Sequence, residues 1–153
     1  MRYGRAFARD WDDYKDEFGS PDGNFYWIGL DRMHDLTSSG AYQLEINLRT
    51  GNESKTMRWE SFSVASESDK YLVSVSGFDQ GTSGLSDRFS PHNGADFSTQ
   101  DRDNDGYSSG SCSSRSGNTG WWYKRCFACH LTHPSGPYYD QYYMESTMVL
   151  KRK

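Results

Sequence analysis

Aromatic residues recur at helical spacing near the beginning of the chain. Successive intervals of four, three and four residues separate Phe7, Trp11, Tyr14 and Phe18. This spacing places the four rings on one face of a helix, so it predicts a helix over about residues 6–18 with the rings in the core. The glycine- and proline-containing run 19–23 then predicts the end of that helix.

The next segment predicts a short second helix. Residues 25–30 form a compact apolar run, and residues 31–36 begin with an aspartate, which favours the start of a helix. Ser38, Ser39 and Gly40 predict the turn that follows.

Three later segments alternate apolar and polar residues with a period of two, as half-buried strands do. They cover residues 42–48, 57–64 and 71–75, and the second changes parity at Glu60 and Ser61, where we expect a β-bulge. Together they predict an antiparallel meander ending near residue 76.

Beyond residue 77 the periodicity disappears. Glycine, serine, asparagine and aspartate dominate as far as Gly120, and a loop region of that length is usually functional or held by ligands. We expect an α+β fold with an antiparallel central sheet, short helices and a long irregular loop region. The expected division is a sheet subdomain over about residues 1–78, a loop subdomain over about 79–141 and a closing strand over about 142–150.

Composition supports a single domain with an aromatic core. The 153 residues include 5 Trp, 11 Tyr and 8 Phe, and the net charge is only −4, so aromatic burial replaces much of the usual aliphatic burial. A mildly acidic chain has no general attraction to nucleic acid. The sequence shows neither an apolar run of about 20 residues, which a membrane span needs, nor a signal-peptide core. We therefore expect that a leader has been removed or that the chain is an excerpt.

An N-glycosylation sequon lies at the first predicted strand turn. It consists of Asn52, Glu53 and Ser54, and it is relevant if the chain is secreted.

Alternating carboxylates mark the centre of the irregular region. Asp101, Asp103 and Asp105 fall on one side of an extended backbone. Three acids this close repel one another unless a cation neutralises them, and Ca²⁺ accepts irregular loops that combine carboxylates with backbone carbonyls. The glycine- and serine-rich residues 106–110 are flexible enough to supply such carbonyls. An EF-hand is excluded because Cys112 occupies the position that requires a glutamate.

The cysteines allow other interpretations. Cys126, Cys129 and His130 match the C-x-x-C-H pattern of haem c attachment, and with His133 they provide the ligand types of a zinc knuckle. Alternatively, Cys112 and Cys126 close a disulfide loop, which contributes roughly 3 kcal/mol and leaves Cys129 as a free thiol or an intermolecular link. A haem or zinc redox protein is therefore the alternative to a calcium module.

Several motifs occur together in an order typical of one known family. They are Trp11 and Tyr14 with Phe18 and Gly19; 25–31 with His34, Leu36 and Thr37; 97–99 with Asp101, Asp103, Asn104 and Asp105; Cys112 with 120–123 and Cys126; and 143–150. In these motifs the chain resembles the fibrinogen C-terminal (fibrinogen-related) domain of ficolins, tachylectins, tenascins, angiopoietins and fibrinogen chains.

The resemblance implies a calcium site in the acidic loop. Its side-chain ligands would be Asp103 and Asp105, joined by backbone carbonyls near Tyr107 and Ser109, with Asp101 as an additional candidate.

The resemblance also implies a ligand pocket beside the calcium, which in lectin-like members takes acetyl groups of sugars. It would be shaped by a Cys112–Cys126 disulfide and by a cis peptide bond before Cys126. The residues expected to line it are Arg125, Cys126, Phe127, Tyr138 and Tyr139.

The chain departs from the family pattern in three places. The family's N-terminal subdomain is missing before Trp11. Phe127 stands where ligand-binding members often have histidine, and the stretch 130–141 is short, so that Tyr138 and Tyr139 replace the usual pocket wall only in part.

The resemblance implies a secreted, calcium-stabilised recognition module without catalysis. It would bind acetylated glycans, as lectins of innate immunity do, or a protein partner. A purely structural extracellular role is a further alternative, and a homo-oligomer is compatible with either role.

Overall fold

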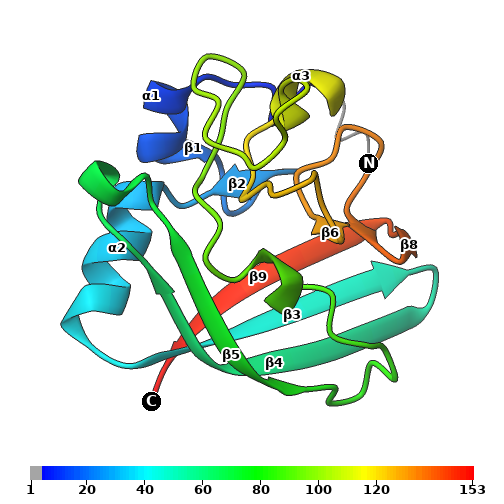
Figure 1. The fold of residues 1–153 in the computed structure, drawn as a ribbon. Coiled ribbons are helices and arrows are strands. Elements are labelled where there is room, and N and C mark those ends of the chain that lie inside the picture. Colours follow the sequence, from blue (N-terminus) through cyan, green and yellow to red (C-terminus); the bar gives the residue numbers. More distant parts are fainter. Residues whose placement is uncertain (1–4) are drawn as a thin grey trace.

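A computed structural model describes residues 5–153, so the first four residues of the expected sheet subdomain lie outside it (Figure 1). Four antiparallel strands form the central sheet, in the order β5-β4-β3-β9. Their bounds are Tyr42–Thr50 (β3), Glu53–Val64 (β4), Val73–Asp79 (β5) and Glu145–Arg152 (β9). The expected α+β class and antiparallel sheet are confirmed, and the closing strand pairs with β3.

The two faces of the sheet differ in chemistry. Leu44, Ile46 and Leu48 of β3 are buried, because one face of the sheet carries the core. The intervening Glu45 accepts hydrogen bonds from Arg58 at 2.8 Å and from Lys151 at 2.7 Å, on the strands on either side. Alternation along β3 was predicted correctly, since each face of the strand has a different environment.

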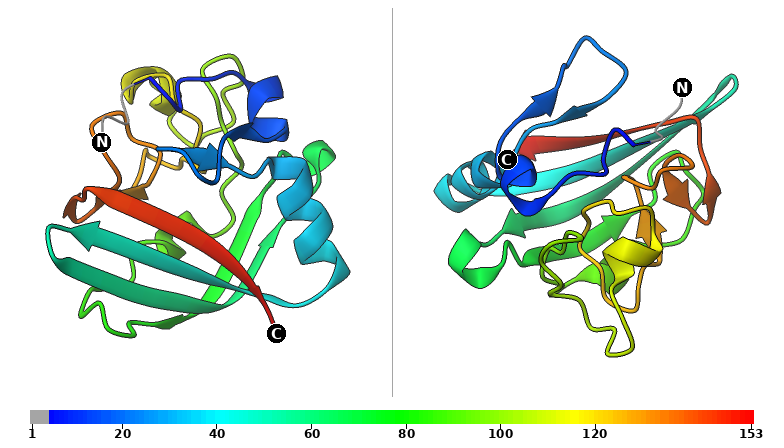
Figure 2. Two further views of the ribbon diagram at one scale, coloured as in Figure 1. Left: turned by 180° about the vertical axis from the view of Figure 1, so that it is seen from behind. Right: turned by 90° about the horizontal axis from the view of Figure 1, so that it is seen from above.

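Most other elements lie on one side of the sheet (Figures 1 and 2). The exception at the sheet's flank is α2 (Leu30–Ser39), which packs along β4. Its Thr37 hydroxyl accepts the Val64 N–H at 3.1 Å, and the His34 ring contacts the Val64 carbonyl at 2.9 Å. The helix continues through Ser38 and Ser39, so the turn predicted there is wrong and begins only at Gly40.

The first predicted helix is too long. Only Trp11–Lys15 (α1) is helical, because the Asp10 side chain accepts the Asp13 N–H and the backbone becomes extended again at Asp16. Phe18 belongs to β1 (Phe18–Gly19), which pairs with β2 (Tyr26–Trp27). All four predicted aromatic rings are nevertheless buried, so their spacing identified the core correctly and the helix incorrectly.

The predicted bulge in β4 is wrong as well. Trp59 lies opposite Phe78 and Ser61 lies opposite Ser76, so β4 carries no extra residue against β5. In both strands the parity of the buried positions shifts by one residue at the same level of the sheet, at Glu60 in β4 and at Gly77 in β5. The φ of +77° at Gly77 favours glycine. Tyr71 lies outside the expected third strand, because its φ of +52° places it in a turn.

The expected irregular region extends from β5 to β6 and contains little regular structure. Short elements near and within it are η1 (Glu67–Asp69), η2 (Ser90–His92), α3 (Cys112–Arg115), β6 (Cys129–His130), β7 (Tyr138–Tyr139) and β8 (Gln141–Tyr142). The last three form a small sheet in the order β6-β7-β8. No helix within residues 5–153 has the length and apolarity that crossing a membrane requires.

Aromatic rings connect the irregular region to the sheet. Trp122 lies 5.2 Å from Phe97 and 6.4 Å from Phe62 of β4, measured between ring centroids, and its indole N–H donates to the Tyr71 carbonyl at 2.9 Å. The fully buried Trp121 packs edge-on against Trp122 at 5.3 Å. The core is therefore aromatic, as the composition predicted.

Candidate functional site

The acidic loop is fixed to the segment that precedes Cys126. Ser98 bridges to Trp121, and the Gly106 N–H donates to the Lys124 carbonyl at 3.0 Å. These bonds hold both ends of the loop against the segment 121–124, so a change in the loop's conformation would shift that segment as well.

Asp105 organises the acidic loop. Its two carboxylate oxygens accept the N–H groups of Tyr107 at 2.9 Å and Cys112 at 2.8 Å. The Asp103 carboxylate accepts the Asp105 N–H at 3.3 Å, which brings the two acids together. Burial raises the pKa of Asp105, the two N–H groups lower it in part, and the neighbouring Asp103 raises it further. The pair is therefore a site of excess negative charge that a cation would relieve.

Asp101 faces a different part of the molecule. Its carboxylate accepts the Trp11 N–H at 3.0 Å and the Thr99 hydroxyl at 2.6 Å. The acid expected as an additional metal ligand instead anchors the start of α1, and the Arg102 guanidinium lies 4.9 Å from the centre of the Trp11 ring. This contact could not be predicted from the local pattern, because it joins residues ninety positions apart.

The oxygen donors near Asp103 and Asp105 suit a hard cation better than a transition metal. No group of three or more His, Cys, Asp and Glu side chains able to hold a metal forms within residues 5–153. In the same part of the chain, no hydrogen bond ends on the carbonyl oxygens of Tyr107 or Ser109. Two carboxylates and two free carbonyls are the donor types that Ca²⁺ uses, so the residues present fit this ion.

A disulfide joins Cys112, at the start of α3, to Cys126. The pairing implied by the family resemblance is confirmed, and the peptide bond between Arg125 and Cys126 is cis, as the resemblance also implies. The disulfide overturns the haem and zinc interpretations, since the Cys126 sulfur is no longer available as a thioether or a metal ligand.

Cys129 and His130 are buried, which removes the remaining basis for a redox or metal site. Cys129 is completely inaccessible, and burial raises the pKa of its thiol well above the usual range. The intermolecular disulfide considered for Cys129 is therefore wrong for the folded chain, and this residue is a free thiol in the core.

His130 is neutral in the core. Burial, followed by the neighbouring His133 and His92, lowers its pKa well below the usual range. Its Nε2 lies 3.0 Å from the Thr119 hydroxyl and 3.1 Å from the Tyr123 hydroxyl. These contacts fix the ring beneath Phe127, whose centroid is 4.8 Å away.

Four rings form a half-exposed group above His130, which we call the ring group. Its members are Phe127, His133, Tyr138 and Tyr142. Tyr138 lies 5.7 Å from Phe127 and 5.2 Å from Tyr142, and His133 lies 5.1 Å from Tyr142, all between centroids. Tyr142 is 51% exposed and was not predicted as a pocket residue. Tyr142 lies directly opposite Tyr138 in the β7–β8 pair, so only recognition of this hairpin in the sequence could have identified it.

Tyr139 is not part of that surface. It is fully buried, its hydroxyl donates to the Ser86 carbonyl at 2.7 Å, and it accepts the Arg88 N–H at 2.8 Å. The expectation that Tyr139 contacts a ligand is wrong, because adjacent residues of a strand point to opposite faces and only Tyr138 points outward.

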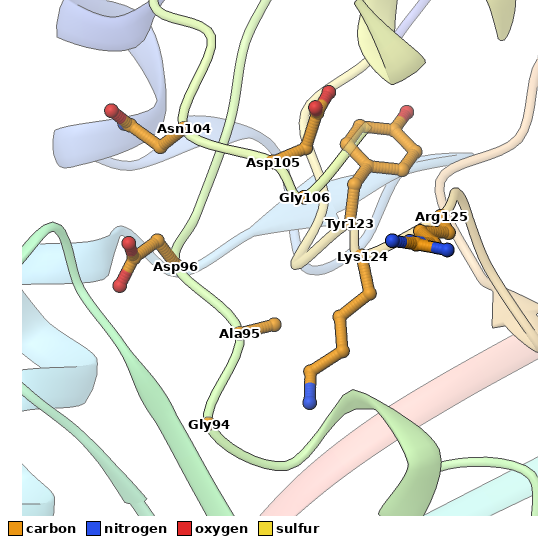
Figure 3. A pocket seen from close by; sticks show the side chains of 9 residues that line it. All are labelled: Gly94, Ala95, Asp96, Asn104, Asp105, Gly106, Tyr123, Lys124 and Arg125. Atoms are coloured by element: carbon orange, nitrogen blue, oxygen red, sulfur yellow. The ribbon is translucent and has the colours of Figure 1, made fainter. Parts of the chain in front are cut away.

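A cavity of about 500 Å³ lies between the acidic loop and the segment before Cys126 (Figure 3). Its lining comes from three segments: Gly94, Ala95, Asp96, Asn104, Asp105, Gly106, Tyr123, Lys124 and Arg125. In Figure 3, Asp96 and Lys124 stand on opposite walls with the Ala95 side chain between them. Within residues 5–153 neither of these two, nor Arg125, takes part in an ion pair, so the cavity presents free charges of both signs.

Comparison with known proteins identifies the fold. A family model described as "Fibrinogen beta and gamma chains, C-terminal globular domain" matches residues 3–151. Tenascin-R of Homo sapiens and of Gallus gallus are each 39% identical over 132 residues, which are 86% of this chain and 9% of each relative. The chain thus spans about a tenth of the length of these curated relatives.

Two solved structures are similar over nearly the whole chain. The fibrinogen-like globe domain of human ANGPTL6 is 30% identical with a TM-score of 0.87, and the match covers 96% of this chain and 72% of that chain. A lamprey fibrin D-dimer complexed with the peptide Gly-His-Arg-Pro-amide is 29% identical with a TM-score of 0.84, covering 94% and 56%.

Proposed function

The chain belongs to the family of fibrinogen C-terminal globular domains, and from that membership we propose that it is a secreted, calcium-stabilised recognition module without catalytic activity. Its ligand would be an acetylated glycan or a peptide segment of a protein partner. A disulfide in a small domain is consistent with an oxidising, extracellular setting.

The observation that carries this proposal is the connection between the acidic loop and the ring group. Asp105 accepts the Cys112 N–H at 2.8 Å, and Cys112 is bonded to Cys126, which immediately precedes Phe127. The position of Asp105 therefore influences a wall of the ring group through one hydrogen bond and one covalent link.

Calcium would be held by Asp103 and Asp105 together with the carbonyls of Tyr107 and Ser109. The ion supplies positive charge to two crowded carboxylates, so it would stabilise the loop without taking part in a reaction. Support for this assignment comes from the raised pKa of Asp105 and from the two carbonyls that accept no hydrogen bond from the described residues.

The ring group would provide the contact surface. Aromatic faces pack well against the apolar faces of sugar rings and against peptide side chains, while their polar ends still contact water. The exposed Arg125 lines the cavity and precedes Cys126 and Phe127 in the chain, so it is available to a polar part of the ligand. The lamprey fibrin structure contains a peptide ligand, which makes a peptide a necessary second probe.

The test compares binding to immobilised N-acetylglucosamine, to immobilised glucosamine and to the peptide Gly-His-Arg-Pro-amide, each with calcium and with a chelator. We expect binding to one acetylated or peptide probe, its loss in chelator, and its loss in Tyr142→Ala. Tyr26→Ala is the control, because Tyr26 is a partly exposed tyrosine that pairs with Glu17 outside the ring group. Binding that survives chelator would refute the calcium mechanism, and no binding to any probe would favour a purely structural module.

A further inference from the structure

The only sequon of the chain begins on an open two-residue turn and continues into β4. Gly51 and Asn52 connect β3 to β4, and the pair Thr50–Glu53 closes the hairpin. Gly51 has a φ of +53° at the first central position, as in a type II′ turn, and a side chain placed there would meet nothing within 4 Å. Asn52 and Ser54 are both exposed, so the acceptor amide and the required hydroxyl are accessible.

Met144 is fixed directly beside this turn. Its N–H donates to the Arg49 carbonyl at 2.9 Å, and its sulfur accepts the Gly51 N–H at 3.2 Å. Met144 is 54% exposed and Tyr142 is 51% exposed, and they are the two exposed large hydrophobic side chains within residues 5–153. The hairpin tip and β8 accordingly lie at the same end of the molecule (Figures 1 and 2).

We propose that Asn52 carries an N-linked glycan whose first sugars cover Met144 and Tyr142, so that occupancy of Asn52 controls access to the ring group. This inference rests on the proposed secretion and recognition function. In the transfer, the Asn52 amide nitrogen bonds to C1 of the first sugar of a lipid-pyrophosphate-linked oligosaccharide. The C1–pyrophosphate bond breaks, the lipid pyrophosphate leaves, and the amide nitrogen loses one proton.

The geometry explains why the glycan would cover these two side chains. Asn52 directly follows Gly51, whose N–H donates to the Met144 sulfur, so a sugar on Asn52 begins close to the Met144 side chain. The apolar face and acetyl methyl group of an N-acetylglucosamine can pack on Met144 and then on the Tyr142 ring, removing both from water. A partner approaching Tyr142 would have to displace those sugars.

The experiment uses the full chain secreted from eukaryotic cells behind an added leader. Mass spectrometry measures occupancy of Asn52, and hydroxyl-radical footprinting measures oxidation of Met144 and Tyr142. Ser54→Ala removes the sequon while keeping Asn52. Ser61→Ala is the matched control, because Ser61 is an exposed serine of the same strand outside the sequon.

We expect Asn52 to be occupied and oxidation of Met144 and Tyr142 to be largely lost in the unmodified sequence and in Ser61→Ala. Oxidation should return in Ser54→Ala and after enzymatic removal of the glycan, while that of Tyr26 stays constant. An unoccupied Asn52, or equal oxidation with and without the glycan, would overturn the inference. Binding of N-acetylglucosamine or peptide by Ser54→Ala tests the proposed function separately, since that variant carries no glycan.

Discussion

Replacing Asp103 by asparagine separates calcium binding from folding. Asparagine keeps an oxygen that can accept the Asp105 N–H, which Asp103 accepts at 3.3 Å, but it removes one of the two charges that would hold the ion. The metal-free Asp103→Asn protein should therefore fold at least as well as the parent, because the repulsion that raises the pKa of Asp105 is relieved.

The size of the calcium effect follows from linkage. An ion that binds only the folded state contributes about 2.7 kcal/mol when its free concentration is one hundred times Kd. For a domain of this length each kcal/mol moves Tm by about 2–4 °C. The parent should gain roughly 5–10 °C in Tm from saturating calcium, and Asp103→Asn should lose most of that gain.

Differential scanning calorimetry in chelator and over a calcium titration measures both quantities. Asp101→Ala is the matched control, because Asp101 is the acid that contacts Trp11 and Thr99 instead of the pair. It should lower Tm in chelator, by the loss of an anchor worth about 1 kcal/mol, and keep the full calcium shift.

Acid should weaken the calcium response. The raised pKa of Asp105 means that protons compete for its carboxylate at a higher pH than for an ordinary aspartate, so the calcium shift fades as pH falls through that pKa. Without calcium the direction reverses, because ionised Asp105 destabilises the fold above its raised pKa and protonation removes that cost. The reasoning fails if Asp101→Ala abolishes the calcium shift while Asp103→Asn preserves it.

Two further predictions concern the fold. Lys151 and Arg58 lower the pKa of Glu45 to about 2 from 4.5, so this acid should stabilise the fold above pH 4.5 and lose that contribution as pH falls toward 2. Glu45→Gln should therefore lower the free energy of unfolding by about 1 kcal/mol at pH 7 and reduce its pH dependence between pH 4.5 and 2, as measured by urea unfolding. The control Glu53→Gln, which lies outside every ion pair found within residues 5–153, should change neither the free energy of unfolding nor its pH dependence. An unchanged pH profile for Glu45→Gln would contradict the ion-pair role of Glu45. A Cβ at Gly120 would lie 2.7 Å from the Tyr14 ring and 2.9 Å from the Phe97 ring, so Gly120→Ala should cost about 1–3 kcal/mol. Gly110→Ala, whose nearest contact would be 3.5 Å away, should be nearly neutral, and equal urea midpoints for the two variants would refute the packing argument.

The sequence predicted features whose cause is local and missed those set by distant contacts. Alternation in β3 was clear because Leu44 and Ile46 face the core while Glu45 lies on the opposite face of the sheet, where Arg58 pairs with it. The aromatic spacing near the beginning indicated burial, but the Asp10 cap and the β1–β2 pairing confine the helix to five residues. The spacing of the rings could not show that Phe7 and Phe18, which lie outside the helix, pack into the same core as Trp11 and Tyr14.

The candidate site shows the same division. The alternating acids predicted a cluster of three carboxylates. Asp101 instead accepts the Trp11 N–H, and this contact exists only because the fold places α1 beside the acidic loop. Two adjacent tyrosines were equally plausible as pocket residues, and the β7 pairing buries Tyr139 while exposing Tyr138 in part. The disulfide, by contrast, was accessible through the family resemblance because the spacing of the cysteines is part of the motif.

The pairing of β9 with β3 has a consequence for biosynthesis. Residues 145–152 lie opposite residues 42–49, so a ribosome must synthesise more than a hundred residues after β3 begins before β9 can close the central sheet. Until then the hydrogen-bonding groups along one side of β3 are unpaired and able to recruit a strand from another nascent molecule. A premature stop anywhere before Glu145 would leave that side permanently open, and such a product should be retained and degraded by cellular quality control.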